Sequence, residues 1–197
     1  MISGPSGTGK GAICAGLVAN QKVAVSVSMT TRQPRGHEVE GKSYYFVNKE
    51  RFLEIQNEDG FIEHAEIYGE YYGTPKGPVE EQLDKGVDVI LEIDVNGAMQ
   101  VKETMPNAVF IFIMPPSPEE LRRRIEKRGT ETAERIACRL ARSDSEIARL
   151  GEYDYCVIND KLDEAISDTE AIIKAERLKV GSGWEKIIER YNKEKEN

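Results

Sequence analysis

A glycine-rich segment followed by a lysine lies close to the amino terminus. The segment consists of Gly4, Pro5, Ser6, Gly7, Thr8, Gly9, Lys10, Gly11 and Ala12. It runs into a helix-compatible stretch over residues 13–20. A glycine-rich turn that opens a helix directs backbone N–H groups and the positive helix end at one point, which suits a phosphate chain. Lys10 adds a mobile positive charge for the outer phosphates, so the spacing predicts a P-loop.

The P-loop pattern is incomplete at one position. The full pattern has Ser or Thr directly after the lysine, whereas this chain has Gly11 followed by Ala12. The alternative interpretation is a flexible glycine-rich amino terminus. Only residues 1–3 precede the loop, so the strand expected before a P-loop is either truncated or unusually short.

Arginines gather in two further places. The first pair is Arg32 and Arg35, in a polar loop that Pro and Gly interrupt. The second group occupies a charge-dense helical region and comprises Arg122, Arg123, Arg124, Arg128, Arg135, Arg139 and Arg142. The planar guanidinium matches phosphate oxygens, so two clusters beside a P-loop indicate two phosphate-bearing ligands.

Some arginines of the second group have a simpler interpretation. Arg122, Arg123 and Arg142 are expected on a solvated helix face, where acidic neighbours pair with them. Arg128 differs, because it falls at a helix break rather than in a paired row. We therefore expect Arg128, and not those three, to contact a ligand.

Composition limits the possible partners. The chain has 197 residues, of which 39% are hydrophobic and 31% charged, enough for one domain with a core. The net charge of −8 disfavours nucleic acid and anionic membranes. Three cysteines without a CxxC pair fit a reducing cytosol, and no signal peptide or membrane span is evident, so a cytoplasmic location is expected.

Strand and helix patterns alternate over most of the chain. Apolar strands are predicted at residues 22–28, 87–93, 108–114 and 155–158. Helical segments between them predict a parallel sheet with helices on both faces. Residues 43–74 differ, since short aromatic-rich pieces surround a helix that Asn48 can cap, and they predict a small, mostly antiparallel insert.

The carboxyl-terminal segment carries a separate apolar stripe. Trp184, Ile187, Ile188 and Tyr191 have the spacing of one helix face. We expect this stripe to pack on the core of the same chain, with a dimer contact as the alternative. The chain is accordingly expected to be a monomer or a homodimer.

Eight segments of the sequence resemble the guanylate kinase family in order and spacing. They are residues 4–10 (GPSGTGK), 26–35 (SVSMTTRQPR), 44–46 (YYF), 61–65 (FIEHA), 71–74 (YYGT), 92–95 (EIDV), 128–131 (RGTE) and 157–160 (VIND). The resemblance covers residues 2 to about 178. It implies a three-layer α/β core with a P-loop and a parallel sheet, a small mixed or antiparallel GMP-binding insert, and a helical lid.

The resemblance also implies domain limits and an activity. The core would comprise residues 1–31 and 79–197, with the lid at about 117–150, and the insert residues 32–78. The activity would be ATP-dependent phosphorylation of GMP or dGMP by in-line transfer. The alternatives are a non-catalytic guanylate-kinase-like module that binds phosphopeptides, and a kinase of another small acceptor.

The resemblance assigns residues to each substrate. Those implied for GMP are Ser28, Arg32, Arg35, Tyr44, Glu63, Tyr72, Thr74, Glu92 and Asp94. Those implied for ATP are the P-loop residues with Arg124, Asn159 and Asp160. Lys10, Arg35, Arg128 and Arg139 would carry the catalytic charges. A carboxylate at Glu63 can accept hydrogen bonds from guanine N1–H and the exocyclic amine, whereas adenine has no donors there.

ATP implies Mg²⁺, and this P-loop lacks the hydroxyl residue that normally follows the lysine. With Gly11 and Ala12 in place of a hydroxyl residue, we expect phosphate oxygens and water to hold Mg²⁺. Glu92 or Asp94 would assist through water, at some cost in metal affinity.

Overall fold

The larger part of the molecule is built on short parallel strands. The computed structural model describes residues 1–20, 23–36, 38–67, 69–127, 133–181 and 184–195. Strand β8 (Ile111–Met114) lies between β1 (Ile2–Ser3) and β9 (Tyr155–Ile158), and both neighbours pair with it in parallel. Phe112 and Ile113 of β8 are fully buried, as expected for a strand that is apolar throughout.

A second parallel pair extends this arrangement. Strand β2 (Val23–Val25) pairs with β7 (Asp88–Ile90), and an isolated bridge between Ile2 and Glu92 connects the two groups of strands. The predicted parallel sheet is therefore confirmed. Strands β2, β7 and β8 are shorter than the apolar runs that predicted them, whereas β9 has the predicted bounds.

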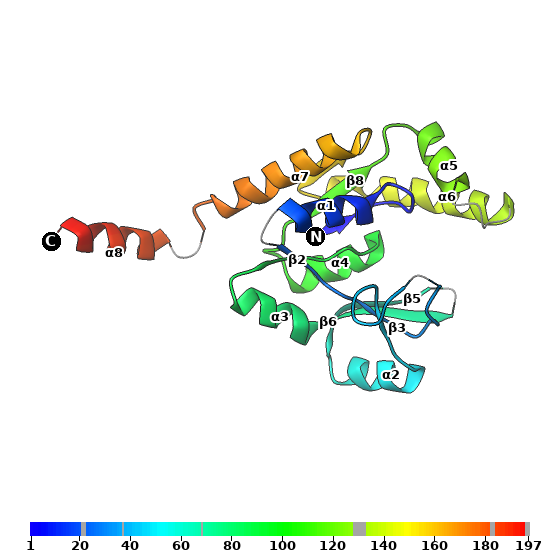
Figure 1. Cartoon of the computed structure of the whole chain (residues 1–197), viewed down its shortest axis with the longest axis horizontal. Helices are drawn as coiled ribbons and strands as arrows, with labels where there is room; N and C mark the ends of the chain where they lie inside the picture. The colour runs from blue at the N-terminus through cyan, green and yellow to red at the C-terminus, as the bar shows by residue number, and fades with distance from the viewer. Residues whose placement is uncertain (21–22, 37, 68, 128–132, 182–183, 196–197) are drawn as a thin grey trace.

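Helices cover both faces of the sheet (Figure 1). Helices α1 (Lys10–Asn20) and α7 (Leu162–Arg177) pack over one hydrophobic cluster. Helices α3 (Lys76–Asp84) and α4 (Val95–Thr104) pack over another. The neighbours Ile90 and Leu91 belong to different clusters, since successive strand residues point to opposite faces.

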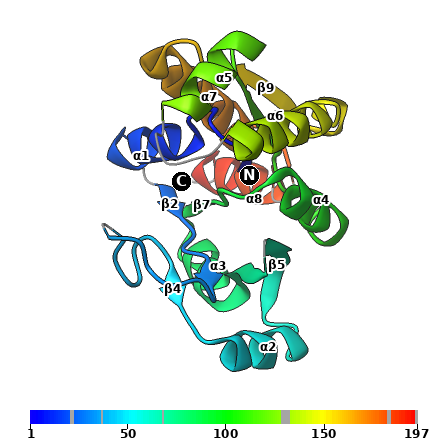
Figure 2. The same cartoon turned by 90° about the vertical axis from the view of Figure 1, so that its right-hand side faces the viewer.

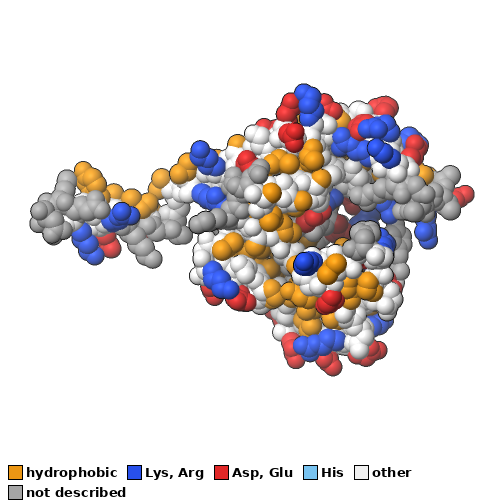
Figure 3. Space-filling view, in the orientation of Figure 1, with side chains coloured by type: hydrophobic (Ala, Val, Ile, Leu, Met, Phe, Trp, Pro, Cys, Tyr) orange, Lys and Arg blue, Asp and Glu red, His pale blue; other side chains and the backbone are white. Residues whose placement is uncertain are grey.

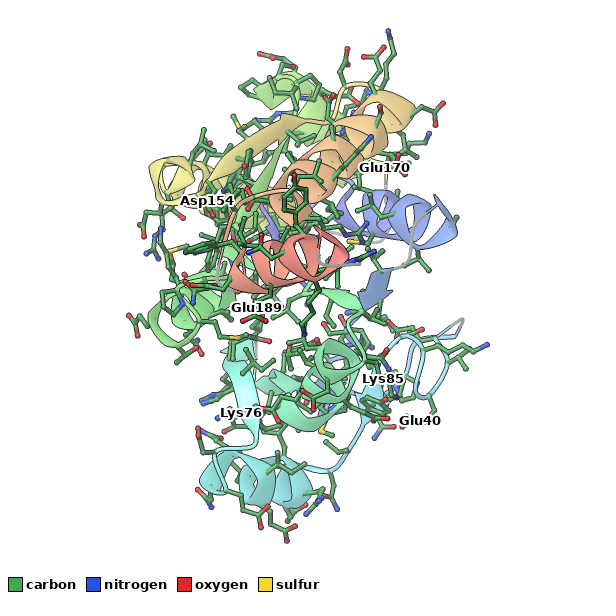
Figure 4. All side chains as sticks on the ribbon, turned by 90° about the vertical axis from the view of Figure 1, so that its left-hand side faces the viewer. Glu40, Lys76, Lys85, Asp154, Glu170 and Glu189 are labelled. Carbon is green, nitrogen blue, oxygen red and sulfur yellow. The ribbon has the colours of Figure 1, made fainter. Side chains whose placement is uncertain are left out.

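Helix α3 begins at Lys76, three residues before its buried residue Val79. Pro78 therefore lies within the first turn, where no intrahelical N–H bond is lost. Lys76, labelled in Figure 4, pairs with Asp59 at 2.5 Å and links this helix start to the insert.

The insert is a four-stranded mixed sheet that lies below the core in Figures 1 and 2. The strand order is β4-β3-β6-β5. The strands are β3 (Met29–Thr30), β4 (Tyr45–Phe46), β5 (Phe61–Ile67) and β6 (Glu70–Pro75). Only the β3–β4 pair is parallel among these pairings. Because β3 begins at Met29, this sheet starts before residue 32, and the domain limits stay a prediction.

One helix covers the insert sheet. Helix α2 (Lys49–Asn57) starts at the predicted cap, since the Asn48 side chain accepts a hydrogen bond from the Arg51 N–H at 2.8 Å. Phe52 is fully buried and stacks on Phe61 with ring centroids 4.4 Å apart. This contact gives the insert a small apolar core of its own.

Two helices follow β8 and lie above the P-loop. Helix α5 (Pro118–Glu126) is capped by Ser117 and buries Leu121 and Ile125. Helix α6 (Ala133–Ile147) comes next, and a short 3₁₀ turn (Leu150–Glu152) leads to β9. The predicted break with Arg128, residues 128–132, lies outside the described residues.

The terminal helix α8 (Trp184–Lys195) corrects an expectation. It extends away from the body in Figure 1, and Glu189 on it is labelled in Figure 4. Its stripe is exposed rather than packed on the core: Ile187 is 69% and Tyr191 is 59% exposed. The periodicity identified the helix, but it carries no information on what the apolar face contacts. Among the described residues, no helix combines the length and apolar character needed to cross a membrane.

Candidate active site

A cleft of roughly 560 Å³ lies between the P-loop, the insert and α6. Figure 3 shows a hollow between the core and the insert in which acidic and basic side chains are visible. The predicted residues that line the cleft are Gly4, Ser6, Gly7, Gly9, Lys10, Gly11, Ala12, Ser28, Tyr44, Glu63, Tyr72, Glu92, Asp94 and Arg139. A second cavity of roughly 620 Å³, between α3, α4 and the end of α7, has mainly apolar walls and none of the predicted site residues.

The P-loop turn requires its glycines. Gly4 and Gly9 have φ values of +137° and +88°, a region that side chains disfavour. A Cβ on Gly4 would lie 2.4 Å from the Ile113 carbonyl oxygen, and one on Gly9 would lie 2.4 Å from Asn159 Nδ2. Asn159 Nδ2 donates to the Thr8 carbonyl at 2.7 Å, so this residue, predicted to contact ATP, also stabilises the loop.

Lys10 is the first residue of α1 and folds over the loop. Its ammonium donates to the carbonyl oxygens of Gly4 at 2.6 Å and Pro5 at 2.9 Å. A ligand with phosphate oxygens above the loop would offer this ammonium stronger, charged acceptors. The lysine is therefore already at the mouth of the loop that the sequence assigned to phosphate.

Arginines reach the loop from the two helices above it. Arg139 of α6 lies 3.3 Å from the Ser6 hydroxyl. Arg124 of α5 donates to the carbonyl of Asn159 at 2.9 Å and lies 3.5 Å from that of Asp160, so the structure brings these three predicted ATP contacts together. Arg124 also pairs with Glu120 at 2.6 Å.

The insert gathers the residues predicted for the acceptor phosphate. Arg32 lies 5.2 Å from the centre of the Tyr44 ring, and that ring meets Tyr72 edge-on at 6.1 Å. Arg35 is in the same loop, but its side chain is exposed and is not part of the cleft wall. Arg32 also lies outside the residues that line the cleft.

Glu38 was not predicted and holds this loop together. Its carboxylate accepts two hydrogen bonds from Arg32, at 2.7 and 2.9 Å, and one from the Arg35 backbone N–H at 2.8 Å. The hydrogen bonds from Arg32 lower the pKa of Glu38 to about 2. The available sequence signal was an acidic residue three positions after Arg35.

The part of the cleft predicted to bind guanine contains a buried carboxylate with hydroxyl neighbours. Glu63 is 6% exposed and accepts a hydrogen bond from the fully buried Thr74 hydroxyl at 2.6 Å. Ser28 lies 3.3 Å from that hydroxyl. Burial raises the pKa of Glu63 to about 7, and the charge of Asp94 adds to the effect. The pKa of such a buried carboxylate depends strongly on whether a ligand donates hydrogen bonds to it.

Asp94 corrects the interpretation of Arg142. Arg142 of α6 donates to Asp94 at 2.7 Å and to Glu146 at 2.8 Å, and all three residues line the cleft. It therefore does not belong to a solvated helix face. The missed signal is the helical spacing of these positions, which places Arg142 and Glu146 on the same side of α6 as Arg139.

The acidic residues near the P-loop fit a metal ion only in part. A Cβ on Gly11 would lie 3.4 and 3.6 Å from the two carboxylate oxygens of Glu92, so this carboxylate faces the start of α1. No group of three His, Cys, Asp or Glu side chains that could hold a metal ion occurs among the described residues. Glu92 and Asp94 offer carboxylate oxygens, which Mg²⁺ accepts as ligands, but water or phosphate oxygens would have to supply most of its ligands.

The chain matches known proteins over nearly its full length. Residues 1–176 match the family model described as guanylate kinase. A guanylate kinase of Clostridium tetani is 53% identical over 180 residues, which cover 91% of this chain and 86% of that protein. A guanylate kinase of Clostridium acetobutylicum is 50% identical over 189 residues, or 96% and 90% of the two chains.

A solved structure agrees with these sequence matches. The crystal structure of guanylate kinase from Anaplasma phagocytophilum superimposes with a TM-score of 0.77 at 37% identity, and the match covers 96% of this chain and 92% of that one. The family match spans the P-loop, the insert and α6, which are the elements that form the cleft. The chain belongs to the guanylate kinase family.

Proposed function

We propose that this cleft binds ATP and GMP, or dGMP, end to end and transfers the terminal phosphoryl group of ATP to the acceptor phosphate. Family membership carries the reaction class. One observation carries the substrate assignment: a buried carboxylate, Glu63, lies in the same cleft as the P-loop lysine, Lys10. No observation on the described residues favours a non-catalytic phosphopeptide module.

Glu63 would select guanine. Guanine N1–H and the exocyclic amine both donate to a carboxylate, and a bidentate contact of this kind discriminates by about 1–3 kcal/mol. Adenine has no donors at these positions, so AMP would leave Glu63 buried without a ligand partner. Thr74, which donates to Glu63, supports its orientation.

The acceptor phosphate would lie at the aromatic end of the cleft. Arg32, Tyr44 and Tyr72 are grouped there, with Ser28 beside Thr74. Arg35 would join them by movement of its loop. A phosphate at this place brings its oxygens toward the P-loop, where the donor nucleotide would lie.

Transfer requires charge compensation more than proton removal. The second pKa of a phosphate monoester is about 6, so the acceptor is largely a dianion at neutral pH and needs no general base. Lys10 and Arg139 would hold the transferring group, and Arg35 would approach from the acceptor side. Arg128 would supply a further cation of the kind that contributes on the order of 10³ to 10⁵ in rate.

The remaining contacts would orient ATP. Arg124, Asn159 and Asp160 form one connected group beside the P-loop, which suits the nucleoside end of the donor. Mg²⁺, when bound, would neutralise charge on the donor phosphates. Glu92, or Asp94, would hold its water ligands in place of the missing P-loop hydroxyl.

A coupled assay of ADP formation with GMP, dGMP, AMP and UMP tests this assignment. We expect GMP and dGMP to be phosphorylated and AMP to be poorer by about two orders of magnitude or more in kcat/KM. The Lys10→Met variant should lose most of its kcat with little change in KM for GMP. A silent wild-type protein, or one that prefers AMP or UMP, would overturn the proposal.

A further inference from the structure

Arg142 joins α6 to the purine end of the cleft. Its Nη2 atom donates to Asp94 Oδ2 at 2.7 Å, and its Nε atom donates to Glu146 Oε1 at 2.8 Å. The side chain is 37% exposed, while those of Asp94 and Glu146 are 26% and 12% exposed. Two carboxylates on different elements thus fix one guanidinium in a partly buried place.

Asp94 is fixed from two sides. Its Oδ1 atom accepts from the Gly97 N–H at 2.8 Å and caps α4, while Oδ2 accepts from Arg142. The cap orients one oxygen, and the arginine determines the direction of the other. Each carboxylate oxygen has a second lone pair, so Asp94 can still accept a hydrogen bond from a ligand.

Glu63 lies directly beside Asp94. A Cβ on Gly97 would be 2.8 Å from Glu63 Oε2 and 3.4 Å from Asp94 Oδ1, so the two carboxylates flank the same glycine. Like charges at this spacing repel, and burial strengthens the repulsion. Arg142 brings a positive charge to the Asp94 side of this pair.

We propose that Arg142 is a positioning residue for recognition of the guanine exocyclic amine. It holds Asp94 so that this carboxylate accepts from one hydrogen of the amine, while Glu63 accepts from N1–H and from the other amine hydrogen. The inference rests on the proposed function, with Asp94 as a contact of the base, as the family resemblance implies, and Glu92 as the carboxylate near Mg²⁺. Helix α6 would then contribute to both nucleotide sites, because Arg139, on the same helix face as Arg142, reaches the P-loop.

Inosine monophosphate provides the test, because it keeps guanine N1–H but lacks the exocyclic amine. For Arg142→Met we expect KM for GMP to rise about tenfold and KM for IMP to change less than about twofold, so that the preference for GMP falls. The KM for ATP should stay within about twofold. Arg142→Lys should restore part of the preference, because it keeps the charge without the fork.

Matched variants separate positioning from a general loss of structure. Arg149→Met is the control, because Arg149 is 39% exposed and forms an ion pair with Glu152 outside the cleft wall. It should leave both KM values unchanged. Glu146→Gln weakens the second anchor of Arg142 without removing the arginine, and should shift the GMP/IMP preference in the same direction by a smaller factor. Thermal melts verify that each variant is folded.

Asp94→Asn distinguishes the two ways in which the idea fails. If Asp94→Asn alters the GMP/IMP preference and Arg142→Met does not, then Asp94 faces the amine and our inference about Arg142 is wrong. If neither variant alters it while the wild type phosphorylates GMP, the assigned place of Asp94 is wrong. Equal rises in KM for GMP and IMP, or a rise confined to ATP, would also overturn the role of Arg142.

Discussion

Arg32 and Glu38 form a bidentate ion pair within the loop predicted to bind the acceptor phosphate, with N–O distances of 2.7 and 2.9 Å. Both side chains are 13% exposed, and Glu38 also accepts from the Arg35 N–H. The carboxylate therefore fixes the arginine beside Tyr44 before any ligand arrives. Pre-organisation of this kind lowers the ordering cost of binding.

Loss of the Glu38 carboxylate should weaken acceptor binding. For Glu38→Gln we expect KM for GMP to rise about three- to tenfold with a smaller change in kcat, because Arg32 must then be ordered by the ligand. Steady-state kinetics at fixed ATP measure this. Glu54→Gln is the control, since Glu54 also pairs with an arginine but is 61% exposed on α2. A lower KM for GMP would instead identify Glu38 as a competitor of the phosphate.

Glu63 should make the stability of the ligand-free protein depend on pH. Its folded pKa of about 7 lies above the ordinary value of 4.5, so its contribution is fully present below pH 4.5 and is lost as the pH rises through 7. The expected loss between pH 5 and pH 8 is about 2 to 3 kcal/mol in the free energy of unfolding.

Urea unfolding of the wild type and Glu63→Gln at the two pH values measures this contribution. The variant should lack that part of the pH dependence, because its amide does not ionise. Glu66→Gln is the matched control, since Glu66 is exposed on the same strand, β5. Parallel pH dependence in the wild type and Glu63→Gln would show that Glu63 does not titrate in this range.

Gly9 should tolerate no side chain. In Gly9→Ala the new Cβ would lie 2.4 Å from Asn159 Nδ2 at a φ of +88°, so we expect a loss of about 2 to 4 kcal/mol in unfolding free energy. Gly77→Ala is the control, because Gly77 is in α3 with nothing within 4 Å of its Cβ, and it should gain up to about 1 kcal/mol. Chemical denaturation of both variants measures these changes. An unchanged free energy of unfolding for Gly9→Ala would contradict the loop geometry.

A hydroxyl at position 12 should improve the use of Mg²⁺. Ala12 lines the cleft in the first turn of α1, so Ala12→Thr places a hydroxyl next to the loop. We expect the Mg²⁺ concentration for half-maximal rate to fall severalfold, because a hydroxyl replaces a water ligand. The measurement is a Mg²⁺ titration at fixed ATP, with Ala15→Thr, on the exposed side of α1, as control. Equal midpoints would mean that position 12 does not reach the metal.

The sequence determined the features that depend on local chemistry. Glycines followed by Lys10 specify a tight turn before a helix, Asn48 specifies a helix start, and the uniformly apolar β8 specifies a buried parallel strand. Each follows from a backbone or solvation preference within a few residues. The P-loop could be predicted from its own residues in the same way, whereas Glu63 and Thr74 were assigned only through the resemblance to the guanylate kinase family.

Only the tertiary structure decided which distant residues meet. Arg142 has the same local pattern as a solvated arginine, yet it lies on Asp94, 48 positions away. The stripe on α8 has the spacing of a core-facing helix but remains exposed. The pairing of Glu38 with Arg32 depends on how the loop folds back on itself. Periodicity and composition report what each side chain can do, whereas its partner is determined by how the elements pack in three dimensions.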